Sequence, residues 1–446
     1  MSKTNPCPGY AVKTGTRRDF LWQLGGGLGG VALASLLKDG GLLGNATAAT
    51  DTMALRPSHH APKAKAVIQI FCPGGLSHVD TWDYKPVLEA RSGKPFDTTG
   101  ELEFFASKPG NCQGSFWKFR QHGECGKWMS DLFPKLATCV DDMAFIHSMT
   151  NKTALHGPAC FMMNSGFTMP GFPAMGSWVT YGLGTETQNL PSFVVLPNIT
   201  KGYEAQSLDV LQALNSQHAA AREEHSELEA RIASYELAAR LQLSAPEVTD
   251  IASESEAIRR LYNLEHKDIG SFGRQCLMAR RLVERGVRFV QLYCGAENTT
   301  AKEVRPNWDS HEDLPRDHGY WGPILDTGAS ALLKDLKSHG MLDDTLVMCT
   351  TEFGRQPGAQ AGIGRDHNPG TFTMWMAGGG VKPGVSYGQS DDLGFQVAEN
   401  PTYSYDLHAT ALHLLGIDHE KLTYYHNGIE RRLTDVHGHV IGELLG

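Results

Sequence analysis

Apolar residues gather in short runs along most of the chain, and the stretches between these runs carry helical patterns. Six runs are rich in β-branched or aromatic side chains: residues 66–71, 143–146, 193–196, 287–293, 346–349 and 372–376. Runs of this length and composition predict strands. Strands that alternate with helices indicate a mainly parallel sheet with helices on both faces. The chain is therefore predicted to be an α/β protein.

The region between the third and fourth runs, residues 204–285, shows no strand pattern. Its segments 219–225 and 228–232 are rich in strong helix formers and contain charge pairs spaced four residues apart, which favour helix. The sequence thus predicts an inserted helical region. Its simplest interpretation is a solvated helical cover that carries no chemistry.

The first 48 residues have the pattern of a twin-arginine signal peptide. Arg17 and Arg18 precede a weakly apolar run at 24–37 that glycines interrupt, and Ala46-Thr47-Ala48 matches an Ala-x-Ala cleavage site. A transmembrane anchor is the alternative, but this run is shorter than the roughly 20 residues that cross a bilayer. We expect export in folded form through the twin-arginine route, a periplasmic or secreted location, and no stable membrane anchor after cleavage.

The charge of the chain argues against nucleic acid as a partner. The whole sequence carries −9, and residues 1–48 hold five basic and two acidic side chains, so the remainder carries −12. A surface of that sign repels nucleic acid. Among the cysteines, Cys112 and Cys125 flank a Gly-rich loop and could pair in an oxidising compartment, although their spacing does not establish a disulfide.

Two clusters of polar side chains follow the first two predicted strands. Asp80 lies in the loop after residues 66–71, where it could bind a metal or cap a helix. His156 follows residues 143–146 and stands near the start of an apolar helix. The helix dipole lowers the pKa of an imidazole at that end, and a neutral imidazole can serve as a ligand or a nucleophile. The alternative is a hydrogen-bonded structural histidine.

The carboxy-terminal third is the richest in candidate chemistry. Polar side chains lie before the helix expected at 324–337, after the strand at 346–349 and before the strand at 372–376: Asp309, His311, Glu352, Arg355, Arg365 and His367. In parallel α/β sheets, ligands collect beyond the carboxyl ends of the strands. Carboxylates and imidazoles suit Zn²⁺ or Mn²⁺. Arg355 and Arg365 suit an oxyanion such as phosphate or sulfate.

At this point the sequence resembles a known family. The segments GGLSHVDTWD, TEFGR, GRDHNP, MAGGGVKPGVSYGQSD and DLHATALHLLGI are similar to the Tat-exported family called domain of unknown function number 1501, a sulfatase-like branch of the alkaline phosphatase superfamily. The resemblance covers nearly all of residues 49–446. It implies an alkaline-phosphatase-like central sheet between helices, and it gives the fold more securely than the activity.

The resemblance also implies roles for single residues. By resemblance, Asp80 corresponds to the metal-binding acid of the superfamily and His156 to its nucleophile. Asp309 and His311 correspond to its Asp and His pair, Glu352 to a later acid and His367 to the last imidazole. The implied cofactor is a divalent metal, Zn²⁺, Mn²⁺ or Ca²⁺. We expect Asp309, His311 and His367 to converge on one metal. Asp80, His156 and Glu352 are expected to form the neighbouring rim, with Arg355 or Arg365 facing the same cleft.

Two positions depart from the superfamily pattern. His156 replaces the Cys or Ser from which sulfatases make their nucleophile, so formylglycine chemistry is excluded there. Phe353 replaces the histidine of an Asp-His pair, which leaves one metal site complete and the other depleted.

Two functions follow as hypotheses. The first is a metal-dependent hydrolase of phosphate or sulfate esters, acting on a small molecule or a glycan. The second is an exported binding protein for an anionic ligand such as a sulfated glycan, with the scaffold kept and turnover lost.

Overall fold

A computed structural model describes residues 54–97, 110–187, 190–196, 250–295, 301, 303–426 and 428–446. The signal peptide expected over residues 1–48 and much of the region 204–285 lie outside these residues. Within 250–285 the chain is helical, as predicted, and contains no strand.

A seven-stranded sheet forms the centre of the molecule, in the order β11-β4-β10-β7-β1-β6-β5. Its strands are β1 (Ala66–Phe71), β4 (Met143–Met149), β5 (Phe193–Leu196), β6 (Phe289–Tyr293), β7 (Thr345–Thr350), β10 (Phe372–Ala377) and β11 (Ser386–Tyr387). All six predicted runs are in this sheet. Strand β10 runs antiparallel to both neighbours, and every other pairing is parallel. The prediction of a mainly parallel sheet is confirmed.

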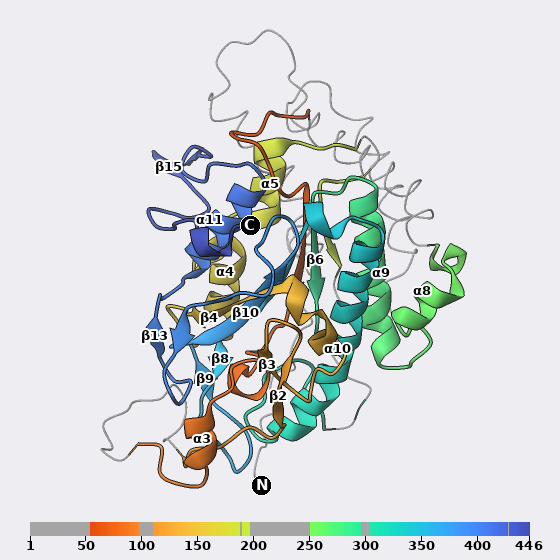
Figure 1. Cartoon of the computed structure of the whole chain (residues 1–446). Helices are drawn as coiled ribbons and strands as arrows, with labels where there is room; N and C mark the ends of the chain where they lie inside the picture. Colours follow the sequence, from red (N-terminus) through yellow and green to blue (C-terminus); the bar gives the residue numbers. More distant parts are fainter. Residues whose placement is uncertain are drawn as a thin grey trace, which may run out of the picture.

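Helices cover both faces of the sheet (Figure 1). One face packs against α9 (Ile269–Glu284) and α10 (Leu314–Ser338), and the other against α4 (His156–Ser165), α5 (Met175–Leu183) and α11 (Ser404–Leu414). Alternate residues of β1 enter the two cores: Ile68 and Ile70 face α10, whereas Val67 and Phe71 face the opposite layer. Every residue of β1 is buried, as expected for a central strand covered on both sides.

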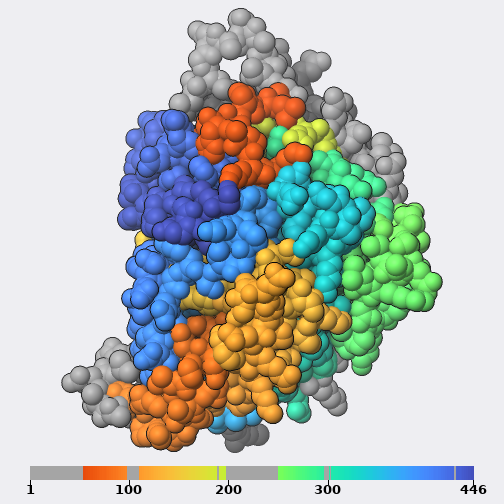
Figure 2. Space-filling model, in the orientation of Figure 1, coloured from red at the N-terminus to blue at the C-terminus, as the bar shows by residue number. Residues whose placement is uncertain are grey.

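Shorter elements complete the chain. They are α3 (Pro86–Ala90), α8 (Glu256–Leu261), and the two-stranded pairs β2 (Phe119–His122) with β3 (Lys127–Ser130), β8 (Gly354–Arg355) with β9 (His367–Asn368), β12 (Gln389–Ser390) with β13 (Val397–Glu399), and β14 (Tyr424–His426) with β15 (Ile429–Arg431). Figure 2 shows the segment after residue 54 lying against the carboxy-terminal part, where Lys63 N and Ala64 N donate to Leu414 O.

Two sequence-based expectations differ from the structure. Helix α10 begins at Leu314, ten residues before the expected start at 324. Cys112 and Cys125 are both free, one buried and one exposed, so they do not form the disulfide that their positions allowed. None of the described helices combines the length and the apolar character needed to cross a bilayer.

The direction of the strands decides where the functional side chains meet. Strands β1, β4, β6 and β7 run the same way, and β10 runs opposite to them. The chain therefore leaves β1, β4, β6 and β7, and enters β10, at one edge of the sheet. Loops at that edge carry His156, Asp309, Glu352 and His367.

Candidate metal centre

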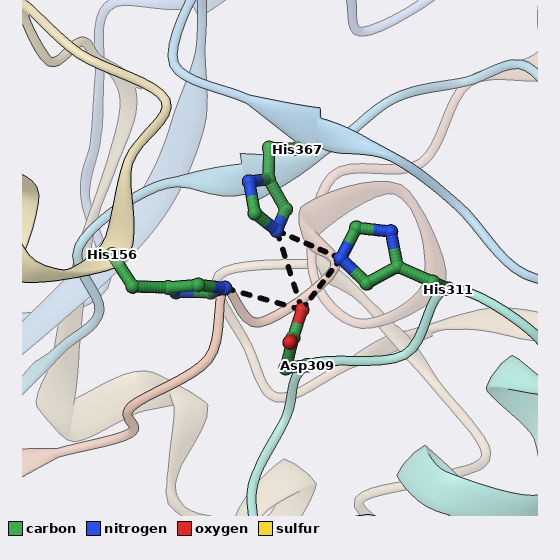
Figure 3. Close-up of side chains that lie close together, drawn as sticks. All are labelled: His156, Asp309, His311 and His367. Carbon is green, nitrogen blue, oxygen red and sulfur yellow. Dashed lines mark hydrogen bonds and ion pairs between the residues drawn. The ribbon is translucent and has the colours of Figure 1, made fainter. Parts of the chain in front are cut away.

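Four side chains converge at this edge of the sheet: His156, Asp309, His311 and His367 (Figure 3). One ligand atom from each lies within 4.8 Å of all the others. The Oδ1 atom of Asp309 is 3.2 Å from His156 Nε2, 2.9 Å from His311 Nε2 and 3.2 Å from His367 Nε2. These spacings resemble those of a tetrahedral zinc site, in which bonds of about 2.0–2.1 Å separate neighbouring ligand atoms by roughly 3.4 Å.

Local structure brings each side chain to this point. His156 is the first residue of α4, His367 begins β9, and Asp309 and His311 lie between β6 and α10. Two glycines allow close approach: a side chain on Gly74 would lie 2.5 Å from Asp309 N, and one on Gly364 would lie 2.0 Å from His311 O. These positions therefore require glycine.

Each of the three imidazoles is oriented through its other nitrogen. His156 Nδ1 donates to Glu352 Oε1, His311 Nδ1 to Gln360 Oε1 and His367 Nδ1 to Ala154 O, each at 2.7 Å. Carbonyl and carboxylate oxygens can only accept, so the Nδ1 atoms carry the protons. The Nε2 atoms of neutral rings then present lone pairs to the centre of the cluster. This is the arrangement in which proteins hold metal-binding histidines.

Two lone pairs face each other in this cluster. His311 Nε2 and His367 Nε2 are 2.9 Å apart, and both rings donate through Nδ1. Two unprotonated nitrogens repel at that distance unless a proton or a cation lies between them. The buried His156 Nε2 atom faces Asp309 Oδ1 at 3.2 Å, and this carboxylate oxygen cannot donate to its lone pair. The donor set therefore fits a bound cation.

The surroundings shift the pKa values of the cluster in opposite directions. Burial disfavours the charged form of His156, but its contacts with Asp309 and Glu352 outweigh burial and raise its pKa to about 9. Burial opposes ionisation of Asp309 as well, yet the three imidazoles and Arg355 lower its pKa far below the usual value. Burial lowers the pKa of His367, despite its contact with Asp309. His156 is thus protonated near neutral pH in the metal-free protein, with its two N–H groups facing Glu352 and Asp309.

The residues expected as a second, depleted site do not form one. His156 belongs to the cluster itself, and Glu352 lies behind it, where Oε1 accepts from His156 Nδ1 and from Gly74 N. Asp80 pairs instead with Arg365: Asp80 Oδ2 is 2.8 Å from Arg365 Nε, and both side chains are fully buried. Neither Asp80 nor Glu352 is among the converging ligand atoms, so their expected role as metal ligands is revised.

The expected role of the two arginines is revised as well. Arg355 is completely buried and donates to Asp309 Oδ1 at 2.6 Å, to Gly75 O and to Arg365 O. Arg365 donates to Gln113 O, Gly114 O and Gln356 O besides its ion pair with Asp80. These guanidinium groups donate to oxygen atoms of the protein. Neither of them faces a cleft where it could bind an oxyanion. Arg355 neutralises Asp309, and Arg365 holds loops together.

The sequence alone did not identify Gln360 and Ala154, which orient two of the imidazoles. Gln360 lies in a loop with no motif, and Ala154 contributes only its carbonyl group. Phe353 packs against His156 and His367 with ring centroids 4.8 Å and 4.5 Å away. It supports the two rings and supplies no ligand.

The model of the family described as "Protein of unknown function (DUF1501)" matches residues 64–207 and 197–445. No curated protein matches the chain. Similar solved structures include the lipoteichoic acid synthase LtaP from Listeria monocytogenes, with 9% identity over 82% of this chain and 76% of that one, at a TM-score of 0.35.

Two further solved structures are similar at the same level. The PsFucS1 sulfatase from Pseudoalteromonas sp. is 12% identical over 87% of this chain and 72% of its own, at a TM-score of 0.34. The alkaline phosphatase from the Antarctic bacterium TAB5 is 9% identical over 73% and 95% of the two chains, at a TM-score of 0.31. Likenesses with TM-scores this low do not transfer an activity to this chain.

Proposed function

This chain belongs to the DUF1501 family of proteins of unknown function, and we propose that it is a metal-dependent hydrolase of phosphate or sulfate esters. The observation that carries the proposal is the fixed tautomer of three imidazoles, whose Nε2 atoms meet around Asp309 Oδ1. When bound, a divalent cation supplies Lewis acidity, which polarises an ester oxygen and makes water a nucleophile at neutral pH.

The donor set favours particular cations. Three imidazole nitrogens and one carboxylate suit Zn²⁺ or Mn²⁺, whereas Ca²⁺ prefers six to eight oxygen ligands. Of the three candidate metals, Zn²⁺ or Mn²⁺ is therefore proposed. Side-chain exposures of 35% for His156 and 26% for Asp309 leave one side of the cluster open to a substrate.

The charge of the site supports an anionic substrate. With neutral imidazoles, the formal charges of Asp309, Glu352 and Arg355 add up to −1, and a bound divalent cation would change the net charge of the site to +1. A bound cation is often the largest local charge in a site. The anion would thus be attracted by the cation itself, since Arg355 and Arg365 are paired elsewhere.

The cluster supplies no hydroxyl or thiol nucleophile. His156 has its Nδ1 bonded to Glu352 and its Nε2 directed at Asp309, so it is better placed to bind the metal than to attack an ester. We therefore favour water as the nucleophile. The twin-arginine pattern of residues 1–48 supports a periplasmic or secreted protein, and export is part of the proposal.

Elemental analysis and turnover test the proposal together. The exported, purified protein is expected to contain about one equivalent of Zn²⁺ or Mn²⁺ and to hydrolyse p-nitrophenyl phosphate or p-nitrophenyl sulfate. Chelation should remove activity, and the same cation should restore it. A protein that neither contains nor binds a divalent cation would refute the proposal. Metal without turnover of any ester would favour the exported binding protein instead.

Metal binding should release close to one proton near pH 7.5. In the metal-free protein His156 is protonated below its pKa of about 9, and a ligand must present a free lone pair. The apparent Zn²⁺ affinity should therefore rise by up to about tenfold per pH unit as pH approaches 9, and then level off. Calorimetric titration in buffers of different ionisation enthalpy counts the proton. His156→Ala should release none, and equal release from both proteins would contradict this assignment.

Glu352→Gln should weaken metal binding by about 10- to 100-fold, the usual effect of losing a partner that orients a metal ligand. The fully buried Glu352 carboxylate fixes His156 through a 2.7 Å hydrogen bond. The amide keeps the shape of the side chain but removes the charge. Zn²⁺ titration against a competing chelator measures the change. Glu399→Gln, at an exposed position of β13, is the matched control, and equal affinities in the two variants would exclude a role for Glu352.

A further inference from the structure

A pocket of about 530 Å³ lies beside the metal-binding cluster. Its walls come from residues 92–93 after α3, from residues 110–113, and from residues 359–362 in the loop between β8 and β9. Figure 1 shows α3 at the same end of the molecule as β8 and β9. The volume is within the usual range for small-molecule sites.

One side chain joins the pocket to the cluster. Gln360 lines the pocket, and its Oε1 accepts the 2.7 Å hydrogen bond from His311 Nδ1. Gly364, four residues on, lies directly against the backbone of His311. A molecule in the pocket would therefore be next to a residue that orients a metal ligand.

The lining is polar and uncharged. Ser92, Asn111, Gln113 and Gln360 provide hydroxyl and amide groups, and the remaining lining residues are glycines, alanines and Cys112. None of the described lining residues is charged or aromatic. Such a surface offers hydrogen bonds to a neutral polar ligand, but no ion pair for a charged group and no aromatic or large aliphatic side chain for a hydrophobic one.

Gln113 supplies an unused donor. Its Nε2 atom is buried and has no hydrogen-bond partner in the described part of the chain. A buried polar group without a partner destabilises a protein by about 1–3 kcal/mol. Because Gln113 lines the pocket, rotation of its amide toward the pocket would let an acceptor of the ligand satisfy this donor. A hydroxyl group can be that acceptor.

The walls are held by backbone contacts that do not need these side chains. Gln113 N donates to Pro357 O and Ala359 N to Asn111 O, both at 2.8 Å. Arg365 donates to Gln113 O at 2.9 Å. The amide side chains are thus presented on a fixed framework, which limits the entropy lost when a ligand binds.

We propose that this pocket binds a neutral carbohydrate, through hydrogen bonds from Asn111, Gln113 and Ser92 to hydroxyl groups. The inference rests on the proposed function in one respect: the carbohydrate is the alcohol part of the ester whose phosphate or sulfate lies at the cluster. Binding of the sugar itself requires no metal.

Saturation-transfer NMR with maltotriose, cellotriose and laminaritriose tests the proposal on the intact exported protein, before and after chelation. At least one trisaccharide should bind in both states. Asn111→Trp, which fills the pocket from an exposed position, should abolish the signal. Gln113→Leu should weaken binding about tenfold. Gln121→Leu, on β2 outside the pocket, is the matched control and should bind normally.

The outcomes separate this inference from the proposed hydrolase. If no trisaccharide binds, or if binding survives Asn111→Trp, the carbohydrate pocket is refuted, whatever the metal content. If triglycine binds in their place, the pocket takes peptide and the inference is wrong. Sugar binding in a protein without metal or turnover would refute the hydrolase and leave the pocket assigned.

Discussion

Replacing Asp309 with asparagine is expected to weaken Zn²⁺ binding by about a hundredfold and to abolish metal-dependent ester hydrolysis. A four-ligand zinc site contributes about 10–16 kcal/mol, so one ligand contributes roughly 3 kcal/mol, or about a hundredfold in affinity. Asp309 Oδ1 lies within 3.2 Å of all three imidazole Nε2 atoms. Asparagine would also leave the buried Arg355 without its carboxylate, and an unpaired cation repels the metal.

Competition with a chromophoric chelator measures this change, and Asp392→Asn is the matched control because Asp392 is exposed. The unfolding of both variants should be compared in the absence of metal, since loss of the Asp309–Arg355 pair lowers stability by itself. A folded Asp309→Asn protein that binds Zn²⁺ within threefold of the wild type would show that these four side chains do not hold the cation.

The sheet could be predicted because its signal is local. A strand buried on both faces must be apolar along its whole length, and β1, β7 and β10 are buried at every position. The antiparallel direction of β10 was not predicted in particular, since apolar runs look the same in either direction. That reversal places the start of β10, rather than its end, at the edge where the other loops meet.

Helix α10 shows how tertiary packing outweighs a local signal. Pro323 within it would ordinarily end a helix, and the expected start at 324 lies directly after this proline. The observed helix begins at Leu314, after Asp313 caps it by accepting from Arg316 N, and continues through Pro323. Leu314 and Trp321 are buried, and Trp321 belongs to the core on the α9–α10 side of the sheet, so their burial stabilises the additional turns.

The proximity of site residues could be predicted where they are close in sequence. It could not be predicted which buried charged side chains would pair with each other. Asp309 and His311 are two residues apart in a loop, so their proximity could be expected. His367 precedes β10 and reaches the same sheet edge because β10 runs antiparallel to its neighbours, which the sequence did not indicate. The partner of a buried charge depends on loops far apart in sequence, as in the pair of Asp80 and Arg365. The sequence could not distinguish an arginine that binds a ligand from one that holds the fold.

Arg365→Met is expected to destabilise the protein by about 3–5 kcal/mol, the usual consequence of removing one partner of a buried ion pair. Asp80 is fully buried, and its remaining donors among the described residues would be Ser77 Oγ and Phe116 N. Gln113 O and Gly114 O would also lose the guanidinium that ties them to the loop at 356. Urea unfolding measures the loss. Arg120→Met, whose partner Asp131 is 38% exposed, is the control and should cost less than about 1 kcal/mol.

Adding Asp80→Asn to Arg365→Met should recover part of the stability, because no unpaired charge then remains buried. If Arg365→Met unfolds like the wild type and only weakens anion binding, Arg365 acts on the substrate as the sequence first suggested, and the interpretation of this ion pair as part of the framework is wrong.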